Sequence, residues 1–200
     1  MKRSDYPMVH GVGINDADYS VRPLLDGKRV QCQAYTKWER MLFRCYGDKG
    51  ILNRPTYDGC SVCDEWLIFS NFKAWMDKQD WYGKNLDKDI IIIGNKVYSP
   101  ETCAFVDGKT NLFVTDRKAK RGESLIGTSY RKSCGKYAAN CGNPITGSNE
   151  YLGIFNSEVE AHEAWRVRKN EIAIQLAAMQ SDKRVSEALL NRYTKATIGE

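Results

Sequence analysis

Seven cysteines are the residues of this chain best suited to hold a metal ion. Cys60 and Cys63 have the C-x-x-C spacing of a zinc knuckle, although a second closely spaced pair is missing. Cys45 and Cys103 could complete a structural site of four thiolates through the fold. In the competing interpretation, these thiols pack as small hydrophobic side chains beside aromatic rings. The spacing therefore leaves two alternatives, a structural zinc ion or a cysteine-rich core.

A second group of residues is suited to contact phosphate. Between residues 115 and 140, seven lysine and arginine side chains are opposed by one aspartate and one glutamate, which gives this window a net charge of +5. Grouped cations release counterions from a nucleic acid when they bind, although many charge runs are only solvated surface. We expect a basic connector over residues 115–121 that follows a phosphate backbone. The cations of the window are Arg117, Lys118, Lys120, Arg121, Arg131, Lys132 and Lys136.

The elements that position these residues begin with two aromatic helices. Between residues 34 and 46, and again between residues 65 and 76, large apolar side chains recur every three or four positions. We expect the two helices to pack on each other, with their aromatic rings as core rather than as a ligand site. Residues 1–33 lack periodicity and predict a loosely packed arm.

The middle of the chain predicts extended structure. Residues 86–100 combine four consecutive isoleucines with the dipeptide Gly94-Asn95, which predicts a strand, a turn and a second short extended piece. Ser99 and Pro100 then resemble the start of a turn or helix.

The last third of the chain predicts strands followed by helices. Ser157 and Glu160 have the spacing of a capping box, so a helix is expected from this point to about Met179. A second helical piece is expected over residues 185–193, after a break near Ser181. The expected strands are residues 125–131, 136–141 and 151–155.

The composition is typical of a globular protein. The 200 residues are 42% hydrophobic and 28% charged, with a net charge of +5, so the chain can form one ordinary domain or two small ones. The sequence contains no apolar run of membrane-spanning length and no secretory signal. The odd number of cysteines suits a reducing compartment. We therefore expect a cytoplasmic protein with no membrane partner.

The C-terminal segment resembles the AP2/ERF-like DNA-binding domain of mobile-element and phage endonucleases. The matching stretches are IGTSYRK at 126–132, GKYAA at 135–139 and YLGIFNSEVEAHEAW at 151–165, although Tyr137 stands where tryptophan is common. Members of this family lay a three-stranded sheet in the major groove of DNA. The resemblance therefore implies that double-stranded DNA contacts Tyr130, Arg131, Lys132, Lys136, Tyr137 and Asn140.

The central segment resembles the HNH, or His-Me finger, fold of homing-type nucleases. It carries LDKD at 86–89, GNKVYSPETC at 94–103 and then Asn111, in the order of a variant motif of that family. Together the two resemblances imply an α+β fold, with a degenerate ββα-metal module followed by the AP2-like three-stranded antiparallel sheet and helix. The implied segments are an arm (1–33), a nuclease-type module (34–114), the connector (115–121), the AP2-like domain (122–180) and a helical tail (181–200).

The chemistry of an active site of this kind is phosphodiester hydrolysis. A divalent cation, Mg²⁺ or Mn²⁺, clamps the scissile phosphate while a general base activates water. Asp87 and Asn111 are the expected ligands, and Asp89 is an alternative ligand or base. The family places its base histidine beside the ligand aspartate, where this chain has Lys88. To act as a base at neutral pH, a lysine needs its pKa lowered by about three units, at a cost of roughly 4 kcal/mol. Lys88 could instead bind phosphate.

Several functions fit these residues. The first is a metal-dependent DNA endonuclease or nickase of phage or mobile-element origin, acting in the cytosol of a bacterial host. The second is a catalytically inactive DNA-binding protein that keeps the nuclease-like fold, such as a regulator or a blocker of host factors. A more distant alternative is a protein-interaction module that uses its aromatic helices to bind a partner.

Overall fold

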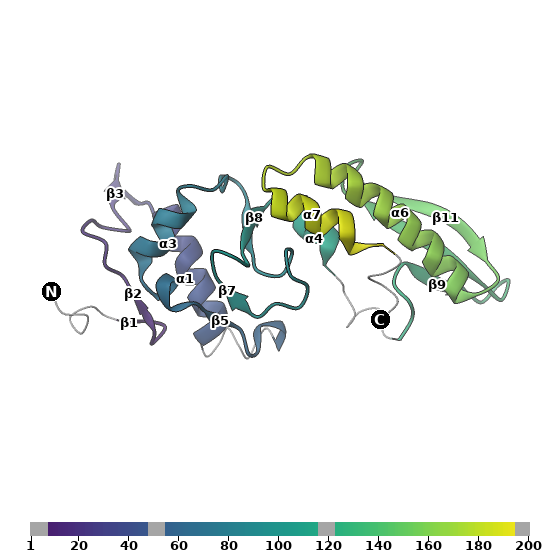
Figure 1. Ribbon diagram of the computed structural model, residues 1–200, viewed down its shortest axis with the longest axis horizontal. Coiled ribbons are helices and arrows are strands. Elements are labelled where there is room, and N and C mark those ends of the chain that lie inside the picture. Colours follow the sequence, from purple (N-terminus) through teal and green to yellow (C-terminus); the bar gives the residue numbers. More distant parts are fainter. Residues whose placement is uncertain (1–7, 48–54, 116–122, 195–200) are drawn as a thin grey trace. The chain divides into compact units, whose positions relative to one another are not determined.

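The computed structural model of the chain describes residues 8–47, 55–115 and 123–194. These residues form a mixed α+β fold with five α-helices and several small sheets (Figure 1). The chain divides into two compact units, residues 1–105 and 106–200. Within the described ranges, no helix has both the length and the apolar character needed to cross a membrane.

The first unit consists of two helices with short strands and turns. β1 pairs with β2, β3 with β4, β5 with β7, and β6 with β8. The boundary between the two units falls within β8. In chain order the elements are β1 (Met8–Val9), β2 (Gly13–Ile14), β3 (Leu24–Leu25), β4 (Lys28–Arg29), α1 (Gln33–Tyr46), η2 (Pro55–Tyr57), β5 (Ser61–Val62), η3 (Asp64–Leu67), α3 (Phe69–Met76), β6 (Asn85–Asp87), β7 (Val97–Tyr98) and β8 (Ala104–Val106).

The predicted packing of two aromatic helices is confirmed. The rings of Trp38 on α1 and Phe69 on α3 lie 5.5 Å apart between centroids, and both side chains are buried. The indole N–H of Trp38 donates to the backbone oxygen of Trp66, at 2.7 Å, so this buried polar group is satisfied. The aromatic stripes form the core of the first unit, as their helical spacing predicts.

The second aromatic segment is not one helix over residues 65–76. The short 3₁₀ helix η3 ends at Leu67, Ile68 is extended, and α3 begins only at Phe69. Ile68 leaves the helical conformation because it bridges to Ile14, and Asp16 accepts a hydrogen bond from the backbone N–H of Ser70. The N-terminal segment therefore sets where α3 begins, which helical periodicity alone does not predict.

The described part of the N-terminal segment packs closely on α1. A Cβ atom added at Gly13 would lie 2.3 Å from Cδ1 of Leu42, a distance that no real packing allows. Residues 8–33 contain two short antiparallel ribbons rather than an irregular arm.

The isoleucine run is not a strand. β6 ends at Asp87, and residues 88–94 form bends and turns before β7. Ile90 is buried, whereas Ile92 and Ile93 are exposed, so the four isoleucines do not present one apolar face. The expected turn at Gly94 is present, with a φ of +75° that favours glycine.

The second unit combines helices with a three-stranded antiparallel sheet in the order β11-β10-β9. The expected capping box is present, because Ser157 accepts from the N–H of Glu160 while the Glu160 carboxylate accepts from the N–H of Ser157. The break near Ser181 is also confirmed, since Asp182 caps the next helix. The elements are α4 (Gly108–Val114), β9 (Thr128–Arg131), β10 (Lys136–Asn143), β11 (Ser148–Phe155), α6 (Glu158–Ala178) and α7 (Lys183–Arg192).

The short helix α4 packs within the second unit, although the predicted nuclease-type module runs to residue 114. The Phe113 ring meets that of Tyr193 edge to face, with 5.6 Å between centroids. The Lys169 ammonium donates to the backbone oxygen of Phe113, at 2.8 Å, and Arg192 donates to that of Val114. These bonds satisfy carbonyls at the C-terminal end of α4.

Candidate nucleic-acid interface

The three-stranded sheet carries the predicted DNA-binding residues that the structure describes. Four predicted residues lie outside the described ranges, namely Arg117, Lys118, Lys120 and Arg121. The other six lie on β9, on β10 and in the turn that joins them, namely Tyr130, Arg131, Lys132, Lys136, Tyr137 and Asn140.

The register of the sheet determines which of these residues share a face. Directly paired residues of antiparallel strands point to the same side, and successive residues of a strand alternate between sides. Arg131 pairs with Lys136, and Asn140 lies four positions further along β10. These three side chains therefore lie on one side of the sheet, which we call the open face.

Helix α6 covers the opposite side. Ala139 and Cys141 of β10 are fully buried there. Glu150 of β11 pairs with Cys141, and its carboxylate accepts hydrogen bonds from Arg168 of α6 and from Asn143. These bonds lower the pKa of Glu150 to about 2, so its negative charge is matched by Arg168.

Close contacts at the start of α6 also hold this helix on the sheet. Thr128 pairs with Ala139 of β10, and its hydroxyl lies 2.9 Å from the carboxylate of Glu158. Gly127 has a φ of +85°, and a Cβ atom there would lie 2.1 Å from Cγ of Trp165. The backbone before β9 therefore approaches the indole as only glycine permits.

The open face also holds exposed residues that sequence reasoning missed. Ser129 and Ile154 both pair with Ala138, and Tyr151 pairs with Asn140. Ser129, Tyr151 and Ile154 are all exposed. Simple alternation along β11 does not identify this set. The register shifts between Gly153 and Tyr151, where Leu152 is the extra residue, and residues 151 and 154 therefore lie on the same side. Tyr151 begins one of the stretches that match the family, but the resemblance does not assign it a DNA contact.

The two predicted tyrosines lie on the other side of the sheet. Tyr130 and Tyr137 pair directly with each other, out of phase with Arg131 and Lys136. The six predicted residues therefore do not form one surface. Lys132 is exposed at the turn, where the backbone N–H groups of Cys134 and Gly135 donate to the Arg131 oxygen.

In the first unit, the predicted catalytic residues stabilise their own loop. One carboxylate oxygen of Asp87 accepts the backbone N–H groups of Asp89 and Ile90, at 2.9 and 2.7 Å. Burial, and next the neighbouring charge of Asp89, raise the pKa of the Asp87 carboxyl. Asp87 therefore acts as a cap for the bend that follows β6.

Lys88 is also engaged within the loop. Its side chain is only 8% exposed, and its ammonium donates to the Asn95 backbone oxygen at 2.7 Å and to the Asp89 carboxylate at 3.1 Å. The Asn95 amide returns a hydrogen bond to the Lys88 oxygen, at 2.7 Å. Lys88 and Asn95 thus close the loop from its two ends.

The expected ligands of the divalent cation lie on different elements. Asp87 and Asp89 belong to the first unit, and Asn111 lies on α4 of the second. Within the described ranges, no three His, Cys, Asp or Glu side chains form a group that could hold a metal ion. The Asp89 carboxylate already faces the Lys88 ammonium. The magnesium or manganese site stays a prediction.

The four cysteines selected for zinc lie in or beside the aromatic core. Cys45, Cys60 and Cys103 are buried, and Cys63 is half-buried. Burial raises the pKa values of the Cys45 and Cys103 thiols to about 12, which favours neutral, packed thiols. All four lie in the described ranges, in which no three-ligand group is found. Zinc binding stays a prediction.

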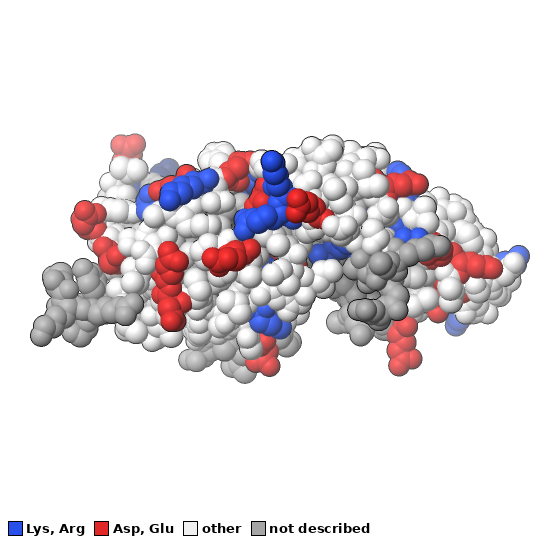
Figure 2. Space-filling model, in the orientation of Figure 1, with Lys and Arg blue, Asp and Glu red and all other residues white. Residues whose placement is uncertain are grey.

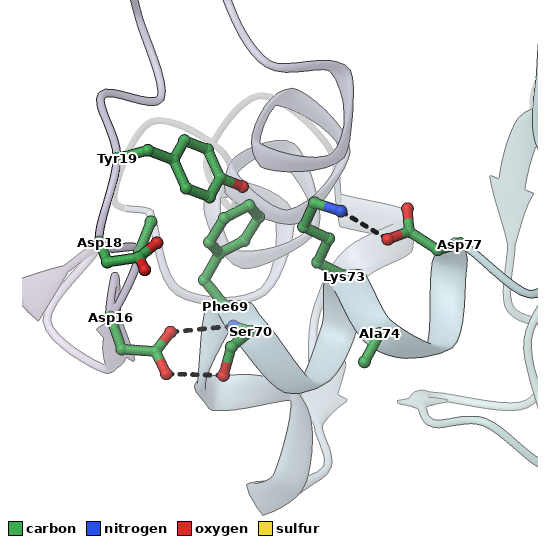
Figure 3. Close-up of a pocket in the computed structure, with 9 residues that line it drawn as sticks. Asp16, Asp18, Tyr19, Phe69, Ser70, Lys73, Ala74 and Asp77 are labelled. Atoms are coloured by element: carbon green, nitrogen blue, oxygen red, sulfur yellow. Dashed lines mark hydrogen bonds and ion pairs between the residues drawn. The ribbon is translucent and has the colours of Figure 1, made fainter.

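A cavity of about 400 Å³ lies in the first unit beside α3 (Figure 3). Its lining includes Asp16, which accepts from the Ser70 N–H and hydroxyl, at 2.9 and 2.6 Å. Lys73 forms an ion pair with Asp77 of the same helix. Figure 3 shows these two pairs on either side of the Phe69 ring. Since these charged groups are bonded to neighbours, the supported role is attachment of the N-terminal segment to α3.

Charge elsewhere is mixed. Figure 2 shows blue and red side chains interspersed over the face in view, without one extended basic patch. Comparison of the chain with protein-family models, with curated proteins and with solved structures finds no match. Among the predicted DNA-binding residues that the structure describes, Arg131, Lys136 and Asn140 are the three that share the open face.

Proposed function

We propose that the protein binds double-stranded DNA through the open face of its three-stranded sheet. The observation that carries the proposal is the register that brings Arg131, Lys136 and Asn140 onto one uncovered side. Arg and Lys neutralise phosphates or donate to guanine, and Asn can pair with the edge of adenine. A sheet with such a face fits the AP2-like resemblance, in which the strands enter the major groove.

The basic segment that precedes β9 in the sequence supports the same partner. Arg117, Lys118, Lys120 and Arg121 fall within the stretch just before the sheet. Adjacent cations add affinity for phosphate without regard to base sequence. In this proposal the connector supplies nonspecific attraction and the open face supplies base contacts.

We propose DNA binding without cleavage as the function that the geometry supports best. The Lys88 ammonium has two acceptors inside its loop, and Asp87 caps the same loop. A general base must instead reach a water molecule beside the scissile phosphate. The endonuclease prediction rests on the HNH resemblance. One structural feature favours it, namely that the paired strands β6 and β8 are followed in the chain by the helix α4.

A salt-titrated binding assay tests the interface. A labelled DNA duplex is titrated with protein at several salt concentrations and followed by fluorescence anisotropy. We expect Arg131→Ala and Lys136→Ala each to weaken binding about tenfold and to reduce the salt slope by about one. Lys183→Ala, an exposed cation on α7, serves as the matched control and should leave affinity unchanged. Equal affinity of all four proteins would place the interface elsewhere.

A plasmid assay tests the absence of cleavage. Supercoiled plasmid is incubated with the protein in Mg²⁺, in Mn²⁺ and in EDTA, and then separated on a gel. We expect intact plasmid in every lane, with salt-sensitive binding preserved. Metal-dependent nicking that Asp87→Asn abolishes would establish the endonuclease and overturn the non-cleaving assignment.

A further inference from the structure

The side of the sheet opposite the open face carries an exposed pair of tyrosines. Tyr130 on β9 and Tyr137 on β10 pair directly, and their ring centroids lie 5.2 Å apart with the planes tilted by 56°. Tyr137 pairs on its other side with Phe155 of β11, so three aromatic residues form a row across the sheet. Tyr130 nevertheless remains 56% exposed, which is unusual for a large ring on the helix-covered side of a sheet.

The start of α6 explains this exposure. The helix begins at Glu158, whose carboxylate contacts Thr128, the residue two positions before Tyr130. The tyrosine row lies one step beyond this contact, toward the turn over residues 132–135. At that turn, Gly135 has a φ of +67° and no side chain, and even an added Cβ atom would reach no closer than 3.9 Å to the Tyr130 hydroxyl. The hydrogen bond that ties the start of α6 to β9 therefore lies two residues before Tyr130, and the turn beyond Tyr130 leaves its hydroxyl uncovered.

The cations nearest in sequence lie around the pair but not all on its side. Lys132 is exposed in the turn that follows Tyr130, whereas Arg131 and Lys136 are exposed on the open face, across the sheet from the tyrosines. An exposed aromatic ring near cations is a combination with which proteins bind unpaired nucleotides, since a base stacks on the ring while a cation meets a phosphate. Bases within a duplex offer only their edges in the grooves, so this surface does not suit paired bases.

We propose that Tyr130 and Tyr137 bind an unpaired nucleobase of a DNA strand. This inference rests on the proposed DNA binding, and it adds a preference for DNA in which the duplex adjoins a single-stranded nucleotide. Arg131 and Lys136 lie on the open face and the tyrosines on the other, so the hairpin of β9 and β10 presents a duplex surface and a stacking surface back to back. The hairpin would then bind at a junction between paired and unpaired DNA.

The test uses a blunt duplex and the same duplex with a short single-stranded overhang that contains 2-aminopurine. Stacking on a ring quenches the fluorescence of this base analogue. We expect binding to the overhang duplex to be about tenfold tighter than to the blunt one, with quenching on binding. Tyr130→Ala should remove both the preference and the quenching. Tyr130→Phe, which keeps the ring and removes the hydroxyl, should keep both.

A control on the open face separates the two proposals. Tyr151→Ala should weaken binding to both DNAs by the same factor and leave the quenching intact at saturation. Equal affinity for the two DNAs, or quenching that persists in Tyr130→Ala, would overturn the stacking site while leaving duplex binding in place. Failure of the wild-type protein to bind either DNA would overturn the proposed function itself, and the stacking site with it.

Discussion

The loop over residues 88–96 in the first unit and the hairpin of β9 and β10 in the second carry the same kinds of side chain, yet they use them differently. In the loop, Lys88 and Asn95 bond to the backbone of the loop itself. On the sheet, Lys136 is exposed to solvent and Asn140 lies on the same open face. A lysine and an asparagine therefore form a structural clasp in one region, whereas in the other they lie on a face that we propose to bind DNA.

The difference follows from where the backbone hydrogen bonds are made. Residues 88–96 lie outside any strand, so the backbone oxygens of Lys88 and Asn95 take donors from each other's side chains. In the hairpin, the strand ladder satisfies the backbone, which leaves the side chains available for a partner. Polar residues in irregular segments are thus weaker evidence for a site than polar residues on a regular strand.

The largest predicted effect is a loss of stability in the second unit that leaves the first unit unchanged. Gly127→Ala places a Cβ atom in the Trp165 ring at a φ that disfavours alanine, and we expect it to destabilise the second unit by about 3–4 kcal/mol. DNA binding should be lost with the sheet, while the first unit remains folded. Unfolding in urea is followed by fluorine NMR of fluorotryptophan, with Trp165 reporting the second unit and Trp38 the first.

Gly147→Ala is the matched control for this substitution. Gly147 also has a positive φ, of +73°, but a Cβ atom there would meet nothing within 4 Å. Only the backbone strain remains, so the expected cost is about 1 kcal/mol. Equal losses in the two variants would mean that the contact with Trp165 does not hold α6 on the sheet. If the Trp38 signal changes at the same urea concentration as the Trp165 signal in Gly127→Ala, the two units do not unfold independently.

The next effect tests the loop. Lys88→Met removes the donor to the Asn95 oxygen and the cation beside Asp89, and we expect the first unit to lose about 2–3 kcal/mol of stability. Lys78→Met, at an exposed position after α3, should change stability by less than about 0.5 kcal/mol.

The DNA affinity of Lys88→Met sharpens the comparison further. If the lysine serves only the loop, the folded variant binds the duplex as wild type does, with the same salt slope. A salt slope reduced by about one in the folded variant would show that Lys88 meets a phosphate after all. The interpretation of Lys88 as a residue that only stabilises its loop would then be wrong.

Helices were the most predictable part of the fold. The apolar spacing over residues 34–46 and the capping box at Ser157 are local patterns, and both have the expected structure. The predictions from sequence were wrong at two places. Contacts with Asp16 and Ile14 set the start of α3, and a loop after Asp87 replaces the expected isoleucine strand. Local pattern carries no information about partners more than 50 residues away.

The candidate site was predicted at the level of residue type but not of geometry. The motif selected Tyr130 together with Arg131, although neighbouring residues of a strand point to opposite sides. It missed Tyr151, since the register shift at Leu152 is not visible in the apolar pattern. Because successive residues of a strand point to opposite sides, the predicted strands alone could have placed the tyrosines and the cations on different faces. The position of the bulge in β11, in contrast, is known only from the structure.

A last comparison concerns two lysines, Lys88 of the first unit, which is buried, and Lys169 of the second, which is half-buried. Lys88 faces the carboxylate of Asp89, whereas Lys169 lies 3.6 Å from the centre of the Phe113 ring and donates to the Phe113 backbone oxygen. The Cys141 thiol of β10 and the Arg192 guanidinium of α7 also act on the Lys169 ammonium. Burial lowers the pKa of Lys169 to about 8, well below the value near 10.4 of an unfolded chain. Between these values the unfolded chain keeps the proton and the folded unit has lost it, so stability rises with pH.

We expect the second unit to gain about 2 kcal/mol between pH 7 and pH 9.5 from this lysine, relative to Lys169→Met, which has no group to titrate. Burial raises the pKa of Cys141, which acts in the opposite direction, and the neighbouring Lys169 lowers it, so both proteins carry Cys141→Ala in this comparison. The measurement is urea unfolding of both proteins across this pH range, followed at Trp165. A difference that does not change with pH would mean that the Lys169 ammonium is stabilised in place by the Phe113 ring, 3.6 Å away, and by the carbonyl, so that burial costs it nothing.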